Sequence, residues 1–361
     1  MLSFVRTLLV LVATLCGAPA ALAQPSFASK ATEASFTVQD FRFHSGEVLP
    51  ELRLQYATLG TPKRDVRGRV TNAVMVLHGT GGSGRQFLQP QFADELYGPG
   101  QPLDISRYYV ILPDGIGHGQ SSKPSDGLRM RFPAYDYADM VEAQRRLLVD
   151  GLGVTQLRLL MGTSMGCMHA FVWGQSHPGF AQAMLPLACL PVEIAGQNRM
   201  WRKLAMDAIK ADPAWKAGNY TEQPVQGLRT AVSLLTLAGA NPLALQAQHP
   251  TRVAADAFTD EAMERGFVGR DANDLLYQVN ASRTYDPSAG LEKITVPVTW
   301  INSADDFINP PALGIAEPAV KRLPRGRFVL IPASAETKGH GTHTWAKFWK
   351  TELVQLIARS R

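Results

Sequence analysis

The chain has 361 residues, a formal net charge of +5 and 45% hydrophobic residues. This length suits one large domain, or a domain with an insertion. Its Lys and Arg residues are spread out and form no basic block, so composition does not support a nucleic-acid-binding protein.

The first residues have the pattern of a secretory signal peptide. Arg6 precedes an apolar run over residues 7–16, and a small-x-small cleavage site ends at Ala23. The run is too short to span a bilayer comfortably. We therefore expect residues 1–23 to be cleaved off and the protein to be periplasmic or secreted, with a retained membrane anchor as the alternative. No later segment of the sequence is long and apolar enough to predict a membrane span.

Two cysteines remain after this cleavage, Cys167 and Cys189. An exported compartment permits a disulfide between them. Free cysteine nevertheless behaves as a small buried hydrophobe. We expect two free, buried thiols, with a disulfide as the alternative.

Strand-like and helix-like patterns alternate along the mature chain. Strands are predicted, in order, at residues 35–43, 52–59, 73–77, 108–112, 156–161, 183–190, 296–302 and 327–331. Helices are predicted at residues 138–149 and 167–173 and from about Pro311. A last helix is expected to place one apolar face inward, formed by Trp345, Phe348, Trp349, Leu353, Leu356 and Ile357. The alternation predicts an α/β fold with a mostly parallel sheet covered on both faces.

Residues 192–283 break this alternation because they are helix-rich and contain few strand candidates. They predict a helical cap inserted into a core formed by residues 24–191 and 284–361. A cap at this point covers the carboxyl edge of the sheet, where ligands bind in open α/β folds.

The pentapeptide Gly-Thr-Ser-Met-Gly at residues 162–166 lies between a predicted strand and a predicted helix. Strand, G-x-S-x-G and helix together are typical of a nucleophile elbow. Glycine on either side of the serine relieves collisions in so tight a turn. Ser164 is therefore the candidate nucleophile, and the alternative is a glycine-rich turn with a solvated serine.

A serine nucleophile needs an acid that orients its base. Asp305 and Asp306 follow the predicted strand 296–302. We prefer Asp306 because it begins an Asp-x-Ile-x-Pro run that resembles the acid loop of serine hydrolases, with Asp305 as the alternative.

The base candidates are His340 and His343, which both precede the last helix. We prefer His340 because its two glycine neighbours make a flexible loop from which an imidazole can reach Ser164. His343 is expected on the first helical turn, capping it or facing solvent. His118 and His169 are interpreted as structural.

An oxyanion hole would use the backbone N–H groups of Met165, directly after the nucleophile, and of Thr80, in the glycine-rich loop after strand 73–77. That loop does not end in the Gly-Lys-Ser/Thr of a phosphate loop. The sequence shows no dinucleotide fingerprint and no metal-ligand spacing, so no cofactor and no metal are expected.

Taken together, these motifs resemble the α/β-hydrolase superfamily and, more narrowly, its homoserine O-acetyltransferase-like branch. The similarity runs from about residue 36 to residue 356 and is strongest at residues 131–144, 162–168, 208–215 and 218–228. It implies an eight-stranded, mostly parallel sheet, the Ser164–Asp306–His340 triad, and a homodimer formed through the cap.

Several positions depart from that branch. Cys167 stands where the branch has a second glycine, and Met206 stands where it has an arginine on the cap helix, although Arg199, Arg202 and Lys203 are nearby. Losing that arginine would weaken the capture of an amino-acid carboxylate. The resemblance therefore predicts the fold and the triad but not homoserine as acceptor.

The favoured function is an exported serine hydrolase that cleaves a small-molecule ester, lactone or thioester through an acyl-enzyme. An acyltransferase of the homoserine type shares the first half of this chemistry. The signal peptide favours the hydrolase, because acyl-CoA is a cytoplasmic donor. A non-catalytic binding protein on the same scaffold is the third hypothesis.

Overall fold

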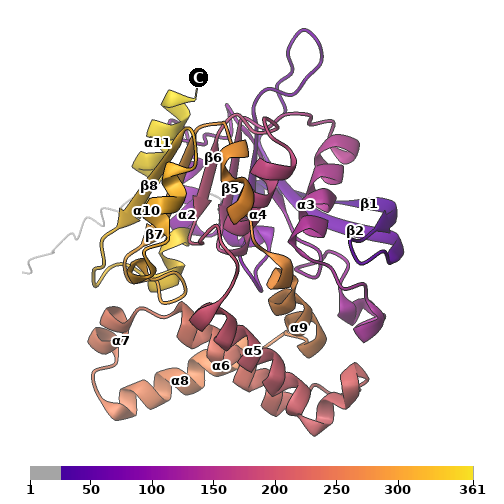
Figure 1. The fold of residues 1–361 in the computed structure, drawn as a ribbon, viewed down its shortest axis with the longest axis vertical. Helices are drawn as coiled ribbons and strands as arrows, with labels where there is room; N and C mark the ends of the chain where they lie inside the picture. Colours follow the sequence, from indigo (N-terminus) through magenta and orange to yellow (C-terminus); the bar gives the residue numbers. More distant parts are fainter. Residues whose placement is uncertain (1–25, 361) are drawn as a thin grey trace, which may run out of the picture.

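The computed structural model describes residues 26–360, so the predicted signal peptide and its cleavage site lie outside the described part of the chain. One sheet of eight strands has the order β1-β2-β4-β3-β5-β6-β7-β8. β1 and β2 form an antiparallel hairpin that pairs antiparallel with β4, and all other neighbours are parallel. This confirms the predicted α/β-hydrolase architecture (Figure 1).

The strands lie close to the predicted runs. Their bounds are β1 Thr32–Arg42, β2 Val48–Leu59, β3 Ala73–Leu77, β4 Tyr109–Pro113, β5 Leu159–Thr163, β6 Met184–Leu187, β7 Val298–Ser303 and β8 Gly326–Ile331. The central strands β3 to β7 are buried along their whole length. Strands buried on both faces lack a polar alternation, which is why continuous apolar runs marked them in the sequence.

Helices cover both faces of the sheet. α3 (Tyr137–Arg146), α4 (Met165–Ser176) and α10 (Ala316–Lys321) contribute to the hydrophobic core on one face. α2 (Pro90–Leu96) and α11 (Lys350–Arg359) contribute to the core on the other. β3 serves both cores, because Met75 packs on the first face while Val74 and Val76 pack on the second.

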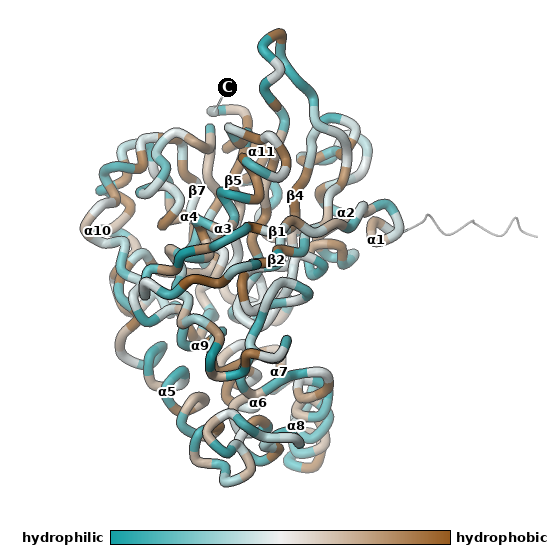
Figure 2. The backbone as a smooth tube through the Cα atoms, turned by 90° about the vertical axis from the view of Figure 1, so that its right-hand side faces the viewer, coloured by the Kyte–Doolittle hydropathy of each residue, from teal (hydrophilic) through white to brown (hydrophobic). Residues whose placement is uncertain are grey.

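Five helices lie between β6 and β7 and form a layer beside the carboxyl edge of the sheet (Figures 1 and 2). We call them the cap: α5 Gly196–Ala211, α6 Val225–Gly239, α7 Pro242–Gln248, α8 Arg252–Phe267 and α9 Ala272–Asn280. α8 buries none of its residues. Within residues 26–360 no single helix is long and apolar enough to cross a membrane, although α6 and α7, bent by 101°, pass that test as a pair.

The C-terminal segment differs from its prediction. The last helix, α11, begins only at Lys350, so Trp345, Phe348 and Trp349 precede it. Phe348 lies in a short 3-10 turn, Ala346–Phe348, and the two tryptophans flank that turn. Trp349 is still fully buried, beside Phe92 of α2. The spacing of large aromatic residues in the sequence does not by itself distinguish a helix from tight turns that bury the same side chains.

The expectation of two free thiols is wrong, because Cys167 and Cys189 form a disulfide. Cys167 lies in the first turn of α4, and Cys189 lies just past the end of β6. β5 and β6 are parallel neighbours, so the helix that follows β5 begins beside the loop that follows β6. This adjacency brings the two Cα atoms to 5.8 Å, within bonding range.

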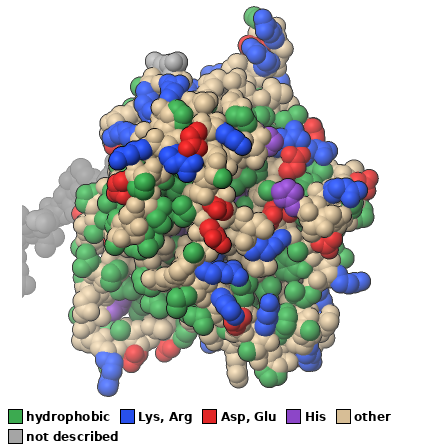
Figure 3. Space-filling view, viewed as in Figure 1, with side chains coloured by type: hydrophobic (Ala, Val, Ile, Leu, Met, Phe, Trp, Pro, Cys, Tyr) green, Lys and Arg blue, Asp and Glu red, His purple; other side chains and the backbone are tan. Residues whose placement is uncertain are grey.

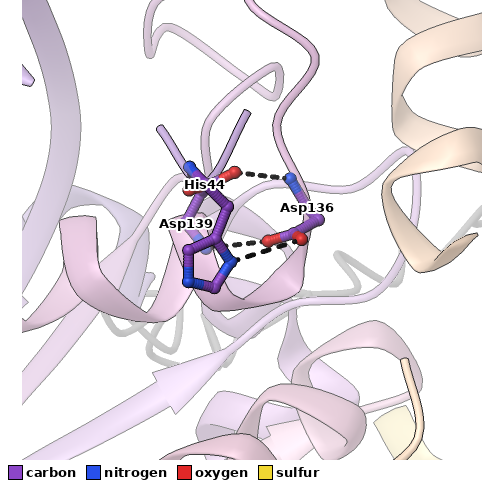
Figure 4. A group of neighbouring side chains, drawn as sticks. All are labelled: His44, Asp136 and Asp139. Atoms are coloured by element: carbon purple, nitrogen blue, oxygen red, sulfur yellow. Dashed lines mark hydrogen bonds and ion pairs between the residues drawn. The ribbon is translucent and has the colours of Figure 1, made fainter. Parts of the chain in front are cut away.

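A small polar cluster begins α3 (Figure 4). The Asp136 carboxylate accepts the N–H groups of Ala138 and Asp139, and the Asp139 carboxylate accepts the Asp136 N–H. Asp139 also accepts the His44 N–H, and Thr284 donates to Asp136. The three side chains His44, Asp136 and Asp139 are close enough to hold a cation, but these bonds make the two carboxylates a helix cap.

We predict that Asp136→Ala lowers the free energy of unfolding by about 1–2 kcal/mol, because two N–H groups of α3 lose their acceptor. Urea unfolding at neutral pH measures this change. Asp150→Ala, at the other end of the same helical segment, removes only an exposed partner of Arg146 and is expected to change stability by less than about 0.5 kcal/mol. Equal losses in the two variants would contradict the capping role.

Candidate active site

Ser164 lies in the turn between β5 and α4 with φ +55° and ψ −111°. Few side-chain-bearing residues adopt such a conformation, and it persists only where the surroundings enforce it. A Cβ on Gly162 would come within 1.9 Å of the Gly166 carbonyl oxygen, and a Cβ on Gly166 within 2.1 Å of the Leu77 carbonyl oxygen. The two glycines therefore allow the backbone approach that exposes the serine.

The structure brings Ser164, His340 and Asp306 together in that order. The Ser164 Oγ lies 2.8 Å from His340 Nε2, and His340 Nδ1 lies 2.8 Å from Asp306 Oδ2. With its proton on Nδ1, the imidazole donates to the carboxylate and accepts from the hydroxyl. This is the arrangement in which a histidine can take the serine proton.

The Asp306 carboxylate is 2% exposed and fully hydrogen-bonded. It accepts the N–H groups of Ile308 and Asn309 and the side-chain amide of Asn309, in addition to His340. Burial alone would raise the pKa of Asp306, but the charge and hydrogen bond of His340 and the amide donors hold it below its ordinary value. Asp306 therefore stays ionised beside the histidine.

The two alternatives for acid and base lie elsewhere. Asp305 accepts hydrogen bonds from Asn241, Thr337 and the Gly339 N–H, so it anchors the loop that carries His340. His343 is in a 3-10 turn, not on the last helix, and its ring packs against His340 instead of facing solvent. Burial, aided by the charge of His340, lowers the pKa of His343 to about 3.

The glycine-rich loop after β3 passes directly beside the nucleophile. A Cβ on Gly79 would lie 3.2 Å from the Ser164 Cβ, so a side chain at this point of the loop would crowd the nucleophile. Within residues 26–360, no hydrogen bond uses the N–H of Thr80, and the N–H of Met165 is in the first turn of α4, where it has no partner within the helix. Both groups are thus available to an external acceptor.

A cavity of about 190 Å³ opens over these side chains, between the carboxyl edge of the sheet and α5. Ser164 and His340 lie in its wall. The remaining wall is mainly apolar and includes Met168, Leu190, Ile194, Ile308 and Leu313. A pocket of this volume suits a small molecule. Lys and Arg side chains are scattered over the face of the molecule seen in Figure 3, with no continuous basic tract there.

Arg202 was noted in the sequence only as a neighbour of Met206, yet it belongs to this cavity. Both residues are buried in α5, but only Arg202 is part of the wall around Ser164. Asn309 was also missed as an acid-supporting residue. Asn309 comes three residues after Asp306, the spacing at which an aspartate side chain caps a turn, and this spacing could have indicated its role.

His118 and His169 take no part in the cavity wall, and both are fully buried. His118 Nδ1 lies 2.8 Å from the Ile116 carbonyl oxygen. His169 Nδ1 accepts the Gln144 amide at 3.2 Å. Burial, and secondarily the charge of His78, lower the pKa of His169 to about 3, so its ring is neutral at physiological pH.

Residues 72–337 match the family profile described as the alpha/beta hydrolase fold. The chain therefore belongs to the α/β-hydrolase fold family. Within it, the chain is 31% identical over 345 residues to a homoserine O-acetyltransferase of Pelobacter propionicus, covering 85% of this chain and 91% of that protein. It is 32% identical over 308 residues to a homoserine O-acetyltransferase of Citrifermentans bemidjiense, covering 76% and 82% respectively. It thus falls in the branch that resembles the homoserine O-acetyltransferases.

Solved structures with the same fold include both transferases and esterases. A homoserine O-acetyltransferase from Bacillus anthracis superposes with a TM-score of 0.79 at 20% identity, covering 91% of this chain and 97% of that one. The acetyl esterase MekB superposes with a TM-score of 0.79 at 23% identity, covering 92% and 98%. Because both activities occur on this scaffold, the fold alone does not choose between them.

We predict that acid destabilises the protein partly through His169. Its pKa in the folded state, about 3, lies below the ordinary value near 6.5, so the unfolded chain takes up the proton first. Stability should therefore fall as pH decreases from about 6.5 towards 3, by up to about 1.4 kcal/mol per pH unit for this group. Urea unfolding of wild type and His169→Gln across this range tests the effect, and an unchanged slope in the variant would contradict it.

Proposed function

We propose that the protein is a serine hydrolase that cleaves a small ester-type bond, with Ser164, His340 and Asp306 as its catalytic triad. The observation that carries this proposal is the unbroken hydrogen-bonded chain from the Ser164 hydroxyl through His340 to the buried Asp306 carboxylate. A fully ionised, fully hydrogen-bonded acid behind the imidazole favours the tautomer that can accept the serine proton.

In this mechanism the Ser164 oxygen attacks the substrate carbonyl while His340 Nε2 takes the hydroxyl proton. The Asp306 carboxylate stabilises the resulting imidazolium. The N–H groups of Thr80 and Met165 would hold the oxyanion of the tetrahedral intermediate. His340 then returns its proton to the leaving group, which departs and leaves an acyl group on Ser164. Water, activated by His340, releases that acyl group and restores the serine.

An acyltransferase is the second candidate, in which an alcohol instead of water takes the acyl group from Ser164. The specific observation in its favour is the identity of 31–32% to proteins named homoserine O-acetyltransferase. One sequence feature favours hydrolysis. The export signal expected at residues 1–23 would remove the enzyme from cytoplasmic acyl-CoA.

We also propose that two copies associate through the cap. A groove of about 530 Å³ between α6, α7 and α8 is lined by apolar side chains that include Leu237, Leu245, Phe258 and Met263. Leu237 and Val253 are exposed, and α8 has no buried residue in the single chain. An apolar face of this kind is typical of a surface that another protein covers.

The central prediction is that short-chain 4-nitrophenyl esters are turned over through Ser164. Ser164→Ala should lose at least about 10⁴-fold in kcat, because no nucleophile remains, and His340→Ala should lose about as much. His343→Gln should lose less than tenfold, because that ring does not contact the serine. Release of nitrophenol by purified mature protein measures all three. Equal turnover by wild type and Ser164→Ala would exclude the serine mechanism.

The same assay separates the two functions when homoserine and acetyl-CoA are supplied. A hydrolase should release acetate from the ester at a rate that homoserine barely changes, and should leave acetyl-CoA largely intact. Formation of O-acetylhomoserine faster than acetate, followed by mass spectrometry, would assign the acyltransferase function instead.

A further inference from the structure

The wall of the catalytic cavity contains a buried positive charge with no negative partner. Arg202 is 2% exposed, and its Nε donates to the side-chain oxygen of Asn198 at 2.9 Å. Its Nη1 makes two long hydrogen bonds to neutral acceptors, the Ser282 hydroxyl at 3.3 Å and the Val279 carbonyl at 3.5 Å. No carboxylate of the described residues is among the groups that act on its charge.

A buried guanidinium is strongly disfavoured unless something compensates its charge. Burial lowers the pKa of Arg202, and neighbouring Arg199 adds to this effect, whereas the Tyr137 hydroxyl partly opposes it. That hydroxyl has no well-formed hydrogen bond within the described part of the chain. The groups around the guanidinium are therefore neutral or positive, and none of them neutralises its charge.

The buried charge of Arg202 lies in the same cavity as the proposed catalytic residues. Arg202 and Asn198, one turn apart on α5, lie in the wall of the same cavity of about 190 Å³ as Ser164 and His340. The only carboxylate in that wall, Glu193, is exposed and makes no ion pair with Arg202 among the described residues. A ligand seated against Ser164 would therefore also reach the guanidinium.

We propose that Arg202 binds a carboxylate group of the substrate, and thereby selects esters that carry a negative charge a few bonds from the reacting carbonyl. This rests on the proposed function, because it assigns a substrate class to the same pocket. The planar guanidinium matches a carboxylate with paired hydrogen bonds, and the surrounding apolar wall strengthens their attraction. The small cavity limits the substrate to a short chain between the two groups.

Matched esters test this selection and show which half of the substrate carries the charge. The mono-4-nitrophenyl ester of glutaric acid has its carboxylate in the acyl half, and O-acetyl-4-hydroxybutanoate has it in the alcohol half. Each is compared with its neutral methyl ester, and 4-nitrophenyl acetate serves as the uncharged reference. Wild type should prefer at least one acid over its methyl ester by tenfold or more in kcat/KM.

Arg202→Met should abolish that preference mainly through a higher KM for the acid, so that the acid and its methyl ester are turned over with similar kcat/KM. Arg202→Lys should restore part of the preference. Arg199→Met, on the same helix but outside the cavity wall, should keep it. The absence of any preference in wild type, or an equal loss on charged and neutral esters in Arg202→Met, would overturn the proposal.

Binding separates this inference from the proposed function. Calorimetry of glutarate binding to wild type, Ser164→Ala and Arg202→Met does not depend on turnover. Glutarate should bind the first two proteins and bind Arg202→Met at least tenfold more weakly. Failure of every ester assay together with this binding pattern would reject the hydrolase and keep the carboxylate site. No binding to wild type or Ser164→Ala would reject the site.

A second inference comes from the disulfide, which lies inside the active site. Cys167 is two residues beyond the proposed oxyanion donor Met165, and Cys189 is part of the cavity wall. The carbonyl oxygen of Ala188, a residue with φ +65°, accepts a hydrogen bond from the Asn309 side-chain amide at 3.1 Å. The same Asn309 amide reaches Asp306 at 2.9 Å. One covalent bond and two hydrogen bonds thus join the nucleophile helix to the triad acid.

We infer that the Cys167–Cys189 disulfide is a positioning element that holds Asp306 in register with Ser164. The segment 188–189 is also tied to β7, since the Cys189 carbonyl accepts from Trp300 and Asn302. Without the disulfide, the strained turn at Ala188 loses its covalent link to α4, and the acceptor for Asn309 is free to shift. Reduction needs an external thiol or phosphine, which supplies the two electrons, and two protons complete the thiols.

Activity measured well below the melting temperature distinguishes positioning from stability alone. The double variant Cys167→Ala/Cys189→Ala, and wild type reduced with a phosphine, should lose about tenfold in kcat with little change in KM. The acid limb of the pH–rate profile should also shift. Asn309→Ala, which leaves the disulfide intact, should shift that limb in the same direction. A lower melting temperature with unchanged kcat and pH profile would overturn the inference.

Discussion

The turn at Ser164 is the constraint on which the rest of the site depends. It places a residue with a side chain at φ +55°, and on each side of it the backbone approaches a flanking glycine too closely to tolerate a Cβ. Gly79 of the adjacent loop makes a third, less extreme approach, to the serine side chain itself. The same close packing that strains the turn brings the nucleophile, the glycine-rich loop and the start of α4 into one small volume.

The parallel sheet explains why residues far apart in the chain meet at this turn. Ser164, Asp306 and His340 follow β5, β7 and β8, and the glycine-rich loop follows β3. Carboxyl ends of parallel strands lie at one edge of the sheet, so each of these loops emerges on the same side. The chain order of the motifs in the sequence was therefore enough to predict which residues meet, although not the distances between them.

Other features could not be read from the sequence, for identifiable physical reasons. The disulfide depends on the adjacency of β5 and β6 and on where each strand ends, and β5 ends two residues later than its apolar pattern suggested. The boundary of α11 was misplaced because 3-10 turns buried Trp349 as effectively as a helix would. Arg202 looked like one of several cap cations, since burial and partners are properties of the packed cap and not of spacing.

Charge is distributed unequally around the site, and this inequality limits what the cavity can accept. The Asp306 carboxylate accepts hydrogen bonds from His340, Asn309 and Ile308, so its negative charge is compensated within the protein. Arg202, which lines the same cavity as Ser164 and His340, has only neutral partners among the described residues. In an apolar enclosure such an imbalance favours an anionic ligand over a neutral one of the same shape. A hydrolase and an acyltransferase would share this preference, because it acts on substrate binding before water or an alcohol reaches the acyl-enzyme.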